Sequence, residues 1–239
     1  MAETGHAKNV EHFAQMIAFC EGYGPDYDPS NQEITIAKLE NKLTASQNGI
    51  DGVTTNIIPW KVAVNSRQDG FEGTRKLATR VVNSFAASGA PESAIDDAKG
   101  FKRKIDGARA ETLVDDPNTP EDESQGNSVS QQSYVQLTEH WDNLIELLEA
   151  HSQYAPNETD LQTTSLTTYV DGLKALNTGV NTTIPPLSNA RIARDEALYS
   201  ETNGLVTLAA LVKKYVKSVY GAGSPQYEQI SGLEFTTPR

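Results

Sequence analysis

The stretch Val53-Thr-Thr-Asn-Ile57-Ile-Pro59 returns 127 residues later as Val180-Asn-Thr-Thr-Ile184-Pro-Pro186. Valine, threonine, isoleucine and proline stand at the same spacing in both stretches. Further matches keep the same order along the chain: Glu11/Glu139, His12/His140, Ala63/Ala190, Arg67/Arg194, Ser84/Ser218, Gly89/Gly223, Pro91/Pro225 and Phe101/Phe235. Matches in constant order predict a tandem duplication, so features present in both copies are expected to be architectural.

The matches divide the 239-residue chain into three parts. We expect one helical repeat at 1–110, a second at 133–239, and an acidic polar linker at 111–132. The linker carries six acidic side chains and no basic one, and it has few apolar residues. Such a composition cannot bury enough apolar surface to form its own core, which is typical of a connection.

The overall charge of −12 restricts the classes of partner. A nucleic-acid binder needs a basic face to displace counterions, and an anionic membrane attracts basic segments, so we expect neither partner. No stretch reaches the roughly 20 apolar residues of a membrane span. The first residues lack the basic and apolar runs of a secretory signal, so we expect a cytoplasmic protein. The single cysteine allows no disulfide within the chain.

The apolar spacing of both copies predicts the same first helix. Phe13, Met16, Ile17 and Cys20 follow at i, i+3, i+4 and i+7, and so do Trp141, Leu144, Ile145 and Leu148. This helix is expected over about 8–22 in the first copy. Because Cys20 corresponds to Leu148, we interpret it as a core side chain and not as a reactive thiol.

The prolines predict the later helix boundaries. A second helix is expected to begin near Ser30 or Asn31, both good N-caps. Since proline suits the first turn of a helix, Pro59 and Pro186 are expected to start third helices at 59–87 and 186–220. Seven added residues between Arg194 and Ser218 are then expected to lengthen the second copy's third helix by about two turns.

These elements predict an all-α protein. We expect an internally duplicated, elongated helical bundle of two three-helix repeats, each with a short C-terminal capping helix after Gly89 or Gly223. Phe101 and Phe235 are expected to close the ends of the bundle. The repeats are expected to pack about a pseudo-twofold axis, because a three-helix unit alone buries little apolar surface.

Candidate site chemistry is sparse. His12 and His140 each follow a glutamate, but neighbours at i and i+1 point apart on a helix, so we interpret both histidines as edges of the core stripe. Asp26, Asp28 and Ser30 begin like a calcium loop, but its sixth and twelfth positions hold Asn31 and Ala37. We therefore expect no catalytic residue, no metal ligand and no cofactor. The candidate partner-binding residues are the matched charges Arg67 and Arg194.

The leading hypothesis is a non-enzymatic structural or protein-interaction protein. Its expected partner is another protein or a further copy of itself, and head-to-tail contacts between unlike copies would build a homo-oligomer. Two alternatives stay open: a small-ligand or metal carrier with a cavity between the repeats, and an enzyme with a cleft between them. The enzyme hypothesis would require four side chains to converge in that cleft, those of Arg67, Arg194, His12 and His140.

Overall fold

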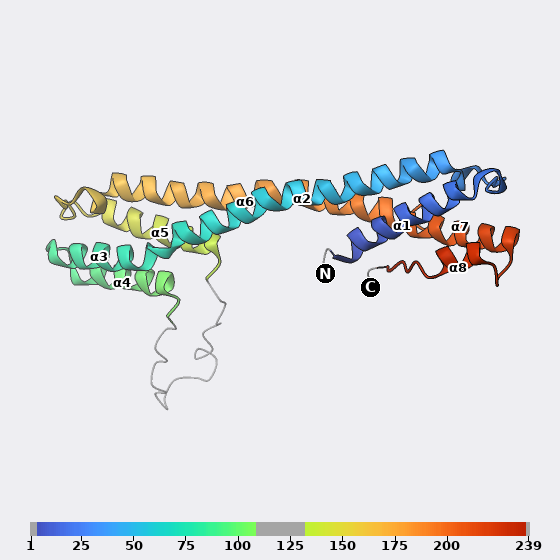
Figure 1. The fold of residues 1–239 in the computed structure, drawn as a ribbon. Coiled ribbons are helices and arrows are strands. Elements are labelled where there is room, and N and C mark those ends of the chain that lie inside the picture. Colours follow the sequence, from blue (N-terminus) through green and yellow to red (C-terminus); the bar gives the residue numbers. More distant parts are fainter. Residues whose placement is uncertain (1–3, 109–131, 238–239) are drawn as a thin grey trace, which may run out of the picture. The chain divides into compact units, whose positions relative to one another are not determined.

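Every regular element in residues 4–108 and 132–237, the part that the computed structural model describes, is a helix (Figure 1). The all-α prediction is therefore confirmed for these residues. The α-helices are α1 (Thr4–Gly22), α2 (Ile36–Glu72), α3 (Thr74–Ala87), α4 (Glu92–Asp106), α5 (Tyr134–Glu149), α6 (Thr163–Tyr199), α7 (Leu205–Tyr220) and α8 (Pro225–Ser231). The predicted linker at 111–132 lies, apart from Gln132, outside the described residues. None of these helices combines the length and the apolar character that crossing a membrane requires.

The chain forms two compact units, and both long helices contribute to each of them. Unit 1 comprises Met1–Lys61 and Thr183–Arg239, and unit 2 comprises Val62–Thr182. Unit 1 thus combines the beginning of the first predicted repeat with the end of the second. Short-range sequence patterns do not predict that these two segments form one unit, because their contacts join residues far apart in the chain.

The core of unit 1 is built on α1. This helix packs against α7 and α8, and its apolar stripe is buried as predicted. Cys20 is fully buried, which confirms its interpretation as a core side chain. The buried apolar side chains of this core are Val10, Phe13, Met16, Ile17, Cys20, Tyr27, Ile34, Leu39, Leu198, Leu205, Leu208, Ala209, Val212, Val216 and Ile230.

In unit 2, α4 packs against both α3 and α5. Trp141 of α5 is fully buried, and its ring meets Tyr169 of α6 edge to face. The buried apolar side chains of this core are Ala78, Val81, Val82, Phe85, Ala94, Ile95, Ala98, Ile105, Trp141, Leu144, Ile145, Leu148, Tyr154, Leu161, Leu166 and Val170. Each large side chain of this kind contributes about 1.5–3 kcal/mol through its removal from water.

The helix boundaries predicted at the prolines are wrong. Pro59 lies inside α2, and Pro185 and Pro186 lie inside α6. A proline removes one helical hydrogen bond and frees the carbonyl four residues earlier. All three prolines are exposed, so this loss falls on the solvent-facing side of each helix, where water can bind the freed carbonyls. The actual boundaries are Gly73, before α3, and residues 200–204, before α7.

The two-turn extension predicted for the second copy is also wrong. Helix α7 has 16 residues against 14 in α3, so most of the added residues form the longer turn at 200–204. Gly204 N–H donates to the Ser200 carbonyl at 2.8 Å within this turn. A Cβ on Gly204 would lie 2.5 Å from main-chain atoms of Ser200, so the turn requires a residue without a side chain.

The helices that follow Gly89 and Gly223, predicted to be matching caps, differ in length and surroundings. Ser224 caps α8 by accepting a hydrogen bond from the N–H of Tyr227, as the Ser-Pro pair predicts. Helix α8 has seven residues, but α4 has 15 and is not a short cap. Phe101 therefore lies within α4, while Phe235 follows the end of α8 in a segment without regular secondary structure. Equal spacing in the sequence did not give the two phenylalanines equal local structure.

Candidate functional site: the matched arginines and the segment after α8

Arg67 is packed against an aromatic ring in unit 2. Its guanidinium carbon lies 4.2 Å from the centre of the Tyr134 ring, an arrangement that attracts a cation to the face of the ring. Phe71, one turn along α2, meets the same ring edge to face at 4.8 Å between centroids. Asn177 of α6 donates to the Tyr134 carbonyl at 3.2 Å. These contacts fix the start of α5 against α2 and α6.

Arg194 lies in unit 1 and is only 6% exposed. Its Nε donates to a carboxylate oxygen of the adjacent Asp195 at 2.9 Å, and its Nη2 reaches the same oxygen at 2.8 Å. Its Cα lies so close to α2 that a Cβ on Gly49 would approach it to 3.0 Å. A guanidinium enclosed in this way presents little surface to a partner. The partner-binding role predicted for both arginines stays a prediction.

The two matched histidines lie at the edges of the cores. His12 of unit 1 donates from Nδ1 to the Glu234 carbonyl at 2.7 Å, which requires the proton to be on Nδ1. His140 of unit 2 is buried. The pair His12 and Arg194 belongs to unit 1, and the pair His140 and Arg67 belongs to unit 2. Within residues 4–108 and 132–237, no three His, Cys, Asp or Glu side chains gather as a metal site would require.

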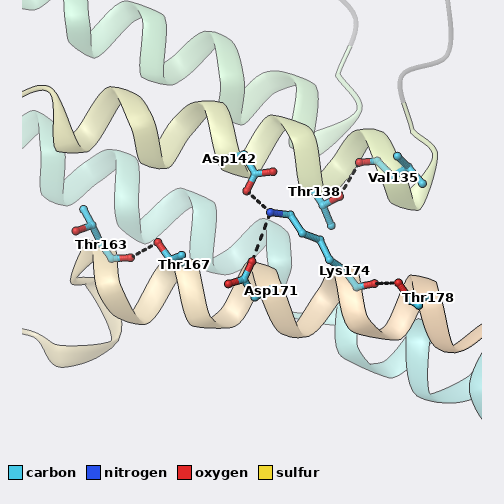
Figure 2. A network of polar contacts seen from close by, with 8 residues as sticks. All are labelled: Val135, Thr138, Asp142, Thr163, Thr167, Asp171, Lys174 and Thr178. Atoms are coloured by element: carbon cyan, nitrogen blue, oxygen red, sulfur yellow. Dashed lines mark hydrogen bonds and ion pairs between the residues drawn. The ribbon is translucent and has the colours of Figure 1, made fainter.

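Unit 2 carries an ion-pair network that the sequence analysis did not single out (Figure 2). Lys174 of α6 pairs with Asp142 of α5 at 2.8 Å and with Asp171, one turn earlier on α6, at 3.5 Å. The Asp142 carboxylate, and after it Asp171, raise the pKa of the Lys174 ammonium. All three side chains are substantially exposed, so the network contributes about 1 kcal/mol or less to stability.

The basic run Lys99–Lys104 lies on α4. Lys99 pairs with Asp96 at 2.8 Å, and Lys102 pairs with Asp106 one turn later. An open depression of about 520 Å³ lies along this helix beside Phe101.

The segment after α8 is held to α1 and α7 by side chains that bind its main chain. Asn9 Nδ2 donates to the Thr236 carbonyl at 2.7 Å, and the Thr236 N–H donates to Asn9 Oδ1 at 3.0 Å. Lys213 of α7 donates to the carbonyls of Ser231, at 3.1 Å, and of Leu233. Burial lowers the pKa of the Lys213 ammonium.

Sequence reasoning missed this site in part. It singled out His12, but only as a residue at the edge of the core. It did not single out Asn9, whose relative exposure is only 1%. A signal was present, because Asn9 interrupts the apolar stripe at the place where the second copy has Leu137. A buried amide requires partners for its donors and acceptors, and here the Thr236 main chain and the Tyr199 hydroxyl supply them.

Comparisons with protein-family models, with curated proteins and with solved structures find no match for this chain.

Proposed function

We propose that the protein is a non-enzymatic structural or protein-interaction protein that associates with further copies of itself or with another protein. The observation that carries this proposal is the exposure of large aliphatic side chains on α6. Ile184 is 47% exposed and Ile192 is 64% exposed. Residues eight apart fall on one apolar stripe of a helix, and such a stripe is the surface by which one helix docks onto another.

A second helix of unit 1 presents the same kind of side chain. Ile58 of α2 is exposed to a similar degree, and Val219 near the end of α7 is also exposed. Single exposed apolar residues are common, but several on long helices of one unit favour an interaction surface over a solvated face. The small-ligand carrier and the enzyme have no comparable feature among residues 4–108 and 132–237 in their favour, and we propose neither.

We also propose that the chain is a tandem duplication, with repeats at 1–110 and 133–239. Two matched features support this proposal. Helices α2 and α6 each have 37 residues. The hydroxyls of Tyr27 and Tyr154 each donate, at 2.7 Å, to the carbonyl seven residues later, which belongs to Ile34 or Leu161. Packing of the repeats about a pseudo-twofold axis stays a prediction.

The test of self-association is the molar mass in solution. Light scattering after size exclusion, over a wide range of protein concentration, is expected to give a mass that rises above the 26.0 kDa of one chain. Ile184→Lys with Ile192→Lys is expected to lower this mass, because burying two ammonium groups in an apolar contact is costly. Gln47→Lys with Asn48→Lys, at two exposed positions of α2 in the same unit, is the matched control for the two added charges.

A mass of one chain at every concentration would contradict self-association. The interaction hypothesis would then require a different protein as partner. If the wild type associates and the double lysine variant associates equally well, the α6 stripe is not the surface involved.

A further inference from the structure

The extended segment after α8 has the features of a bound peptide. Residues 233–237 form no helix, and they follow α8 through Gly232. Leu233 and Phe235 are half-buried against the core of unit 1, while Glu234 and Thr236 are exposed. This alternation is that of an extended chain with one face on a surface, since successive side chains point to opposite sides.

The surface beneath it recognises main-chain atoms. We call this surface the tail groove and define it by Asn9 and His12 of α1 and Lys213 of α7. These three side chains bind the carbonyls of Leu233, Glu234 and Thr236 and the N–H of Thr236. Recognition through main-chain hydrogen bonds, with pockets for alternate side chains, is a recurring mode of peptide binding.

One side chain of the segment adds selectivity. The Phe235 ring meets the His12 ring edge to face at 6.1 Å between centroids, and the Lys213 ammonium lies 5.5 Å from the Phe235 centroid. An aromatic ring at this position therefore contacts two of the three residues of the tail groove. Leu233 supplies the second apolar contact.

The groove belongs to one copy of the predicted duplication. Where unit 1 has Asn9 and Lys213, the matched positions of unit 2 hold Leu137 and Thr79. In unit 2 the longer α4 packs against α5, while in unit 1 α8 ends at Ser231 and leaves the extended segment to cover α1. A feature of one copy alone is not required by the repeated architecture.

We propose that the tail groove binds the segment Leu233–Thr236 of a second copy of this chain in exchange for its own. The same hydrogen bonds form whichever copy supplies the segment, and the exchange of an identical element between copies is a low-cost route to a dimer. This inference rests on the proposed self-association and adds a second contact between copies to the exposed side chains of α6. The occupant is a second copy because the only sequence seated on the groove in the described residues is this one.

Two full-length variants test the exchange. The first, Asn9→Leu with His12→Ala, has an impaired groove and an intact segment. The second, Leu233→Ala with Phe235→Ala, has an intact groove and an impaired segment. An equimolar mixture is expected to form a heterodimer that neither variant forms alone, detected by native mass spectrometry. A mixture that contains only the species of the separate variants would overturn the proposal.

A peptide measurement gives the affinity and guards against misfolding of a variant. A dye-labelled peptide with the sequence of residues 231–237 is added to the full-length Leu233→Ala/Phe235→Ala chain, and fluorescence anisotropy is recorded. Saturable binding is expected, with at least a tenfold loss on adding Asn9→Leu, because two main-chain hydrogen bonds disappear. Asn41→Leu, on an exposed position of α2, is the matched control and is expected to leave the affinity unchanged. Equal affinity with and without Asn9 would overturn the proposal.

The outcomes also separate this inference from the proposed function. If the wild-type chain self-associates, and does so equally with Asn9→Leu/His12→Ala, and the mixture gives no heterodimer, the tail groove fails and the proposed function stands. If the wild type self-associates, loses this association with Asn9→Leu/His12→Ala and keeps it with Ile184→Lys/Ile192→Lys, the tail groove stands and the exposed side chains of α6 are not the contact.

Discussion

The guanidinium of Arg67 and the ring of Tyr134 form a stacked pair, 4.2 Å from the guanidinium carbon to the ring centre. Arg67 is on α2 and Tyr134 is the first residue of α5, so the pair joins two segments that lie far apart in the chain. The contact gives a structural reason for one of the two matched arginines. The strength of this contact can be measured as the coupling free energy between the two side chains.

A double-mutant cycle is expected to detect this coupling. Arg67→Met and Tyr134→Ala, alone and together, should give a coupling of about 0.5–2 kcal/mol in the free energy of unfolding, because the cation is partly removed from water above the ring. Urea denaturation followed by circular dichroism measures the four proteins. Arg75→Met, at an exposed position of α3, is expected to change stability by less than about 0.5 kcal/mol. Strict additivity of the two changes would show that the stacking contributes nothing.

The buried tyrosine hydroxyls of the two units are expected to contribute similarly. Tyr27→Phe and Tyr154→Phe each remove a 2.7 Å hydrogen bond and leave a buried carbonyl without its donor. Each substitution should lower the free energy of unfolding by about 1–3 kcal/mol. Tyr227→Phe, which removes the hydroxyl of a half-buried ring that faces Lys217, is the control. A cost for one tyrosine and none for the other would contradict equivalent roles.

Two glycines are expected to respond to alanine in opposite directions. Gly204→Ala places a Cβ 2.5 Å from the main chain of Ser200, so the turn before α7 must move and stability should fall by about 2 kcal/mol or more. Gly52→Ala, inside α2 with open space around the new Cβ, should raise stability by about 0.5–1 kcal/mol. Thermal unfolding of both variants in parallel checks the signs. A stabilised Gly204→Ala protein would contradict the close approach of residue 204 to the main chain of Ser200.

The cores could be predicted because they depend on local periodicity. The spacing of Phe13, Met16, Ile17 and Cys20 repeats on one helix face, and the second copy has large apolar residues at the same places. A leucine at the matched position indicates that the side chain at position 20 is packed, and Cys20 is indeed fully buried. Comparison of the two predicted copies thus identified core residues that a single segment leaves ambiguous.

The helix boundaries could not be predicted because proline has two opposite uses. It begins helices well, and it also occurs within a long helix when its missing hydrogen bond falls on the exposed side. Which use applies at Pro59 depends on the side of α2 that faces solvent, and tertiary packing decides this. The contacts of Asn9 with Thr236 could not be predicted for a related reason, because no local pattern pairs residues so far apart in the chain.

The buried thiol makes unit 1 sensitive to alkali. Burial raises the pKa of Cys20 from 9.0 to about 12, the neighbouring hydroxyl of Tyr27 being a smaller, opposing influence. The folded protein therefore holds this proton more tightly than the unfolded chain does. Its contribution to stability is complete below pH 9.0 and is lost as the pH rises through that value towards 12.

Urea midpoints measured across this alkaline range are expected to fall, and Cys20→Ala should make the fall shallower by the contribution of one proton. The comparison is of slopes, because the smaller side chain also lowers stability at every pH by leaving space in the core. In the same range the folded wild type should react with a thiol reagent only at the rate of unfolding, since a buried neutral thiol is a poor nucleophile. Parallel pH dependences for the two proteins, together with rapid labelling of the folded wild type, would place Cys20 in contact with solvent and contradict its place in the core.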